Sequence, residues 1–182
     1  MKIDRIHHVA YRCNDAKETV LWYGKMLKMD FVLAIAENEV PSTKEPDPYM
    51  HVFLDAGHGN VLAFFELPTR APNPTNGRDP NTPSWVQHIA FKVKSRAELL
   101  EFKAHLQANG VEVLGVTDHG VFHSIYFFDP SGHRVELACP DPDEASQLAK
   151  LDAVKWEMLE EWSRTKRAPK HAAFLHAKEL SK

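Results

Sequence analysis

Residues 86–110, VQHIAFKVKSRAELLEFKAHLQANG, repeat the pattern of residues 6–27, IHHVAYRCNDAKETVLWYGKML. Each copy begins with a short strand-like segment in which His is followed by an aliphatic residue, Ala and an aromatic residue. A polar cap comes next, and apolar residues then recur at three-to-four spacing, which is typical of an amphipathic helix. Self-similarity of this kind indicates two copies of one folding unit.

The two helices are predicted at Ala16–Leu27, capped by Asn14 or Asp15, and at 96–109, capped by Ser95. Three strands follow each helix: 31–37, 49–55 and 61–67 in the first copy, and 111–117, 123–128 and 133–139 in the second. Each copy is therefore strand, helix and three strands. The predicted fold class is α+β, with two paired βαβββ modules forming a curved mixed sheet.

The modules occupy residues 4–67 and 85–139, and the segment 68–84, rich in Pro, Asn and Gly, is predicted to link them. Residues 1–140 then form one domain, and residues 141–182 form a helical C-terminal extension. Apolar residues recur at helical spacing in this extension: Leu148, Leu151, Val154, Met158 and Trp162. The extension packs either on the domain or on a partner subunit, which makes a homodimer one expected assembly.

The composition narrows the class of protein. The 22 Lys and Arg residues against 25 Asp and Glu leave a net charge of −3, which gives no electrostatic footprint for nucleic acid or an acidic membrane. The N-terminal residues lack the apolar core of a secretory signal, and no apolar run is long enough to span a bilayer. We therefore expect a cytoplasmic protein whose partner is a small molecule.

A few polar residues fall on one face of the predicted sheet. Side chains alternate across a strand, and the bulky apolar residues of each first strand must pack against the helix. His8 and His88 then project from the opposite, concave face, and Glu136 and Glu66 are placed there by the same argument. A single strand histidine is most often structural. Its repetition in both modules, with acidic partners, predicts a metal site.

These residues carry a family resemblance. Paired modules with His in each first strand and Glu in the last strand resemble the vicinal oxygen chelate superfamily, which includes glyoxalase I, methylmalonyl-CoA epimerase, fosfomycin and bleomycin resistance proteins and extradiol dioxygenases. The segments HHVAY, QHIAF and DPSGHRVEL occur in order over about residues 4–139. The resemblance implies that the modules enclose a metal site.

The stretch from Thr117 to Leu137 resembles the signature of the extradiol ring-cleaving dioxygenases. That signature has a histidine two residues after a Thr, then five residues, an aliphatic residue, Tyr, two residues, an acid, Pro, any residue, Gly, three residues and Glu. Every place is filled here, by Thr117, His119, Ile125, Tyr126, Asp129, Pro130, Gly132 and Glu136.

The resemblance implies a function. It implies that His8, His88 and Glu136 bind Fe(II) facially, leaving coordination sites for substrate and oxygen. It also implies that His119 is an acid/base in the second sphere and that Tyr126 hydrogen-bonds a bound catecholate. The expected protein is a small extradiol dioxygenase that cleaves a catechol-type ring with O2 in the catabolism of aromatic compounds.

Two other functions stay open. In glyoxalase I and related isomerases or CoA-ester epimerases, the resemblance implies four protein ligands, and His8, Glu66, His88 and Glu136 fill that pattern too. Mn, Ni, Co or Zn are the alternatives to Fe(II) as the bound metal. The second alternative is a protein that binds a small molecule without catalysis, because the same fold also sequesters drugs.

Overall fold

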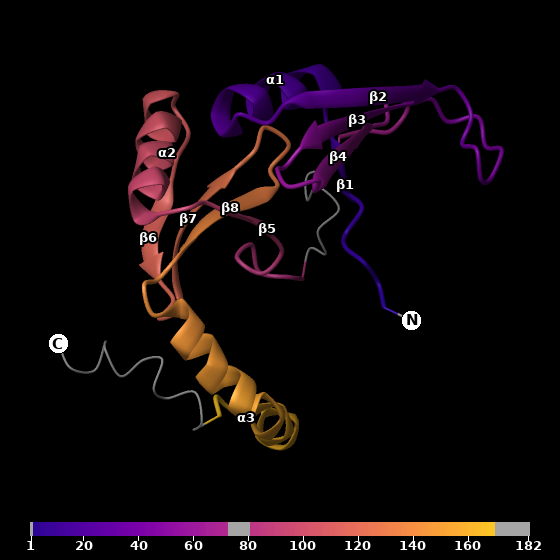
Figure 1. Ribbon diagram of the computed structural model, residues 1–182. Helices are drawn as coiled ribbons and strands as arrows, with labels where there is room; N and C mark the ends of the chain where they lie inside the picture. The colour runs from indigo at the N-terminus through magenta and orange to yellow at the C-terminus, as the bar shows by residue number, and fades with distance from the viewer. Residues whose placement is uncertain (1, 73–80, 170–182) are drawn as a thin grey trace.

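The structure is a computed structural model that describes residues 2–72 and 81–169. Eleven elements follow in chain order: β1 (Val9–Cys13), α1 (Ala16–Leu27), β2 (Phe31–Glu37), β3 (Tyr49–Asp55), β4 (Val61–Glu66), β5 (Ile89–Lys92), α2 (Arg96–Ala108), β6 (Leu114–Asp118), β7 (Phe122–Phe128), β8 (Arg134–Pro140) and α3 (Glu144–Thr165). Figure 1 shows the two modules side by side, with α3 extending from the second one.

Each module forms its own four-stranded mixed sheet. The strand orders are β1-β4-β3-β2 and β5-β8-β7-β6, so the first strand of each module pairs in parallel with the last. The helix that follows the first strand makes the crossover that this parallel pairing requires. The α+β class and the repeated βαβββ module are confirmed, although the two modules form two sheets rather than one continuous sheet.

The local signals that predicted the helices are also those that begin them. The Asp15 side chain accepts a hydrogen bond from the backbone of Glu18 at the start of α1, and Ser95 does the same for α2. The bounds of α1, β2 and β3 match the prediction. The main difference is β6, which begins at Leu114 rather than 111 and has an irregular register between Gly115 and Thr117.

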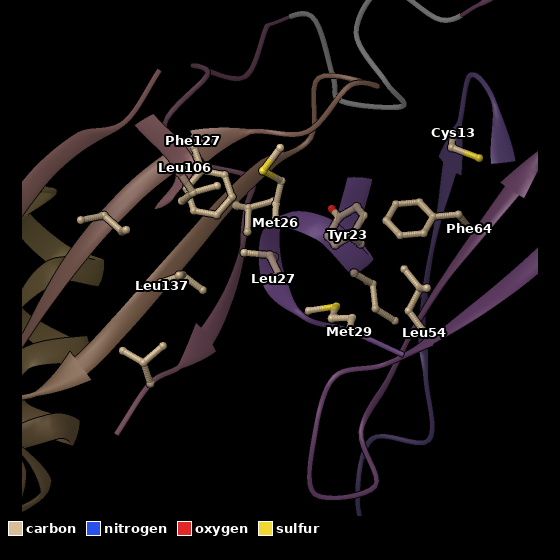
Figure 2. Packing of buried hydrophobic residues seen from close by; sticks show 14 of the residues in the cluster. Cys13, Tyr23, Met26, Leu27, Met29, Leu54, Phe64, Leu106, Phe127 and Leu137 are labelled. Carbon is tan, nitrogen blue, oxygen red and sulfur yellow. The ribbon is translucent and has the colours of Figure 1, made fainter. Parts of the chain in front are cut away.

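One hydrophobic core joins the modules. Figure 2 shows Met26 and Leu27 of α1 lying toward Phe127 of the second sheet, while Tyr23 lies beside Phe64 of the first. The Tyr23 hydroxyl also donates a hydrogen bond to Asp129, in the turn between β7 and β8, over 3.1 Å. The modules therefore meet through α1 and the β7–β8 turn, on the helix side of both sheets.

The other side of each sheet carries no helix of its own module, and we call it the open face. On the first sheet it presents His51 and Phe53 of β3 and, from the edge strand β2, Leu33 and Ile35, which are each 45% exposed. On the second sheet it presents Ser124, Tyr126 and Glu136. These open faces correspond to the predicted concave face.

Helix α3 has no buried residue, and Trp156 and Trp162 are 69% and 48% exposed. The predicted extension is thus helical over 144–165, while 170–182 lies outside the described residues. Cys13 and Cys139 are free and buried. Within residues 2–72 and 81–169, none of the helices combines the length and the apolar character that crossing a bilayer requires.

Candidate metal centre

The open face of the second sheet holds a buried carboxylate with a full set of partners. Glu136 of β8 is 3% exposed and lies between Ala90 of β5 and Tyr126 of β7 in the strand register. Its Oε1 accepts hydrogen bonds from the Ser124 hydroxyl and, over 3.2 Å, from the Tyr126 hydroxyl. A buried carboxylate held through one oxygen keeps the other oxygen available for a cation.

His88 faces that second oxygen. Its Nε2 lies 2.8 Å from Glu136 Oε2, and its Nδ1 lies 2.9 Å from the backbone oxygen of Val86. Since a carbonyl can only accept, Nδ1 carries a proton. Nε2 faces the Glu136 carboxylate, to which it donates a hydrogen bond unless a metal ion takes the place of that proton between the two atoms. Metal-binding histidines are commonly oriented in this way, by a backbone carbonyl on the other ring nitrogen.

This pair fits a divalent ion. Two adjacent ligands of an octahedral ion lie about 3 Å apart, close to the separation of Nε2 and Oε2. The His88 side chain is 31% exposed, so the pair can be reached from solvent. It borders a pocket of about 350 Å³ on the open face that is also lined by Lys92, Phe122 and Glu144.

His119 and Tyr126 extend the same network. His119 lies in the β6–β7 turn, where its backbone donates to the carbonyl of Phe122, and its Nε2 lies 2.7 Å from the Tyr126 hydroxyl. Burial, followed by the negative charge of Glu136, raises the pKa of Tyr126 above its usual value. The phenol therefore stays protonated near neutral pH and can donate to Glu136 or to His119.

His8 lies apart from this network. It is exposed at the start of β1, with its ring centroid 6.3 Å from that of His51 and 6.0 Å from that of Phe53 on the open face of the first sheet. Among the described residues, His8 forms no group with His88 and Glu136 whose ligand atoms all lie within 4.8 Å of one another. Within one chain, the predicted three ligands are therefore not brought together.

The predicted equivalence of Glu66 and Glu136 is wrong. Ala10 pairs with Ala63, whereas Ala90, its counterpart in the repeat, pairs with Glu136. Ala63 thus occupies the place of Glu136 in the first module. Glu66 follows three residues later on the helix face, where its Oε2 accepts a hydrogen bond from the backbone of Ala16 over 2.7 Å. Its carboxylate supports the N-terminus of α1.

Two features of the second sheet were not predicted from the sequence. Ser124, a partner of Glu136, could have been found as the small polar residue in the otherwise bulky strand FHSIYFF. On the helix side of this sheet, Asp118, His123 and Asp141 come within 4.8 Å of one another, with His123 3.7 Å from each carboxylate. No sequence signal joins these three, since Asp141 lies beyond β8.

Comparisons with known proteins agree with this fold. The family described as the Glyoxalase/Bleomycin resistance protein/Dioxygenase superfamily matches residues 5–137. Biphenyl-2,3-diol 1,2-dioxygenase 2 of Rhodococcus globerulus is 33% identical over 105 residues, which are 53% of this chain and 54% of that protein. The putative ring-cleaving dioxygenase MhqA of Bacillus subtilis (strain 168) is 26% identical over 144 residues, 78% of this chain and 42% of that protein.

The aligned regions thus span only about half of the length of these two curated relatives. Among solved structures, a glyoxylase/bleomycin resistance protein/dioxygenase domain from Frankia sp. EAN1pec is similar with a TM-score of 0.58 and 16% identity, over 77% of this chain and 100% of that one. The fosfomycin resistance protein FosX of Listeria monocytogenes has a TM-score of 0.55 and 21% identity, over 79% and 98%. At these identities the structures show a shared fold.

Proposed function

We propose, on the premise that this chain belongs to the Glyoxalase/Bleomycin resistance protein/Dioxygenase superfamily, that it is an extradiol dioxygenase for catechol-type substrates. The observation that carries the proposal is the continuous network from His88 through Glu136 and Tyr126 to His119 on one open face. It joins two candidate metal ligands to two groups that can hold a proton. The dioxygenase relatives support the same reaction class.

In this proposal His88 and Glu136 hold a single Fe(II), and His8 is the third protein ligand. Two imidazoles and one carboxylate form the ligand set that leaves three positions for substrate and oxygen. The bound metal would supply Lewis acidity for the loss of the catechol protons, together with oxygen chemistry. Mn, Ni, Co and Zn accept similar ligands, so the identity of the metal is part of the proposal.

The chain's own residues handle the protons. His119 Nε2 takes a proton from a catechol hydroxyl and returns it as the ring opens, because an imidazole nitrogen can both accept and donate a proton. Tyr126 keeps its own proton and uses it to hydrogen-bond the anionic oxygen of the substrate. Both atoms of O2 enter the ring-opened product, so the reaction needs no external reductant.

His8 reaches this site, we propose, from a second copy of the chain. Among the described residues, the modules join on the helix side of their sheets, and Leu33 and Ile35 of the first open face are exposed. If the first open face of one copy covers the second open face of another, His8 completes the ligand set and those apolar side chains lose solvent contact. The homodimer then has two composite sites.

The structure gives less support to the two alternative functions than to the dioxygenase. A four-ligand isomerase or epimerase site needs a carboxylate from the first module, and Ala63 stands at that position while Glu66 lies on the other face. A protein that only binds a small molecule has no evident need for the His119–Tyr126 pair. Among the described residues, no contact specifically supports either alternative.

The proposed activity is tested by loading the protein with Fe(II) under nitrogen and adding a panel of catechols with measured oxygen. We expect one O2 consumed per catechol and a yellow ring-fission product. The absence of oxygen uptake with every catechol would contradict the proposal. Conversion of a hemithioacetal by the Ni- or Co-loaded protein, without oxygen uptake, would replace it with the glyoxalase alternative.

A further inference from the structure

Arg134 lies on the open face, beside the candidate metal centre. It begins β8 two residues before Glu136, so alternation places both side chains on the same face, and it pairs with Phe128 of β7. Its Cζ lies 4.3 Å from the centroid of the Tyr126 ring. The guanidinium is therefore held against a residue that the proposed function uses to bind substrate.

This guanidinium has no anionic partner among the residues that the structure describes. Its Nε is shielded from solvent without a hydrogen-bond partner, and the aromatic face of Tyr126 satisfies a cation only in part. By contrast Lys92, on the far side of His88 and Glu136, lies 3.8 Å from Glu144. Of these two cations, Arg134 is the one that lacks a partner of opposite charge.

The geometry points to a carboxylate on the substrate: we propose that the site takes a catechol with an anionic ring substituent, which Arg134 binds. The inference rests on the proposed function and adds the class of substrate to it. Residues two apart in a strand, such as Arg134 and Glu136, are separated by about 7 Å. The distance from the two chelating hydroxyls of a catechol to a substituent on the opposite side of its ring is comparable. The planar fork of arginine matches both oxygens of a carboxylate.

The test compares the binding of two ligands of similar shape, 3,4-dihydroxybenzoate and 4-methylcatechol, to the full chain with Fe(II) under nitrogen, by calorimetry. We expect the wild-type protein to prefer the carboxylated ligand by at least about 10-fold, the usual effect of a charge-assisted hydrogen bond. Arg134→Gln should abolish the preference, and Arg134→Lys should retain part of it. Arg96→Gln, an exposed arginine at the start of α2, is the matched control and should keep the full preference.

Equal binding of the two ligands by the wild-type protein, or equal weakening of both by Arg134→Gln, would overturn the inference. The second result would mean that Arg134 only positions Tyr126. If Arg134→Gln does not fold, the preference of the wild-type protein and the preference retained by Arg134→Lys still show whether Arg134 binds the carboxylate. A preference that depends on Arg134, found without oxygen uptake, would reject the dioxygenase and keep the carboxylate site. Turnover of both catechols with equal KM would keep the dioxygenase and reject the carboxylate site.

Discussion

His88 Nε2 and Glu136 Oε2 lie 2.8 Å apart, on side chains that come from the parallel strand pair β5 and β8. The contact is either an ion pair that serves only stability or two ligands of a metal ion. The orientation of His88 by the Val86 carbonyl and the position of the pair at a pocket favour the metal. Metal content and turnover of variants at the residues of this network separate the two possibilities.

Replacing Glu66 by Gln should leave metal content unchanged. The side chain caps α1 from the helix face, so the loss of its charge at the helix N-terminus should lower the free energy of unfolding by about 0.5–1 kcal/mol. Metal analysis and urea denaturation measure the two effects. A drop in metal content would mean that Glu66 is a metal ligand and would favour the isomerase alternative.

Removing the Tyr126 hydroxyl should impair turnover while the metal stays bound. Tyr126→Phe deletes the group that contacts His119 and Glu136, and we expect kcat to fall about 10- to 100-fold with a smaller change in metal affinity. Steady-state kinetics and metal analysis of one preparation measure both.

Tyr23→Phe is the matched control. It also deletes a buried phenolic hydroxyl, one that donates to Asp129 in the core, and should cost about 1–2 kcal/mol of stability with kcat unchanged. If both variants lose kcat equally, Tyr126 acts only through stability.

Co-expression of two inactive variants tests the composite site. His8→Ala and His88→Ala should each lack turnover, but a mixed dimer places both defects in one site and leaves the other site intact. Random pairing then restores about a quarter of wild-type activity. Separate tags on the two chains allow the mixed dimer to be isolated and assayed. An inactive mixed dimer would contradict the sharing of ligands between subunits.

The pH dependence of stability should reveal the buried Asp129. Burial raises its pKa above the usual value, despite the nearby His133 and several hydrogen bonds. A raised pKa means that its stabilising contribution is complete below the unfolded-state pKa and is lost as pH rises through the folded-state pKa. Relative to Asp129→Asn, the wild-type protein should therefore become less stable across that window, as measured by denaturation at a series of pH values.

Asp47 supplies the opposite control. Hydrogen bonds from Thr69 and Arg70 lower its pKa, so its contribution is present above the unfolded-state pKa and is lost as pH falls through the folded-state pKa. The difference between the wild-type protein and Asp47→Asn should shrink on acidification. The same slope in both comparisons would mean that other groups dominate the acid response.

Strand alternation predicted much of the second module correctly. The buried apolar residues Val135 and Leu137 fix which way β8 faces, and Glu136 between them must then face the other side. The signature likewise named His119 and Tyr126, which lie in hydrogen-bond contact. The positions of Glu136, His119 and Tyr126 depend on strand periodicity and on a short hairpin. Both features can be predicted because they involve residues that are close in sequence.

Alternation along a strand was not sufficient to predict the positions of Glu66 and His8. The glutamates are the last acidic residues of matching strands, but their distance from the preceding turn differs, and only the cross-strand register reveals Ala63 as the counterpart of Glu136. The position of His8 depends on how one module packs against another. That packing is set by contacts such as Trp22 with Phe127, which are distant in sequence and carry no periodic signal.

Anaerobic titration of the metal-free protein with Fe(II), followed by calorimetry, tests whether His88 and Glu136 bind a metal ion. We expect one Fe(II) per chain in the wild-type protein and an affinity at least about 100-fold lower in His88→Ala, because that change removes a ligand rather than a supporting contact. His105 of α2 is half-buried and its ring contacts the Lys25 carbonyl, away from the candidate metal centre, so His105→Ala should bind Fe(II) as the wild-type protein does. Unchanged Fe(II) affinity in His88→Ala would mean that His88 is not a metal ligand.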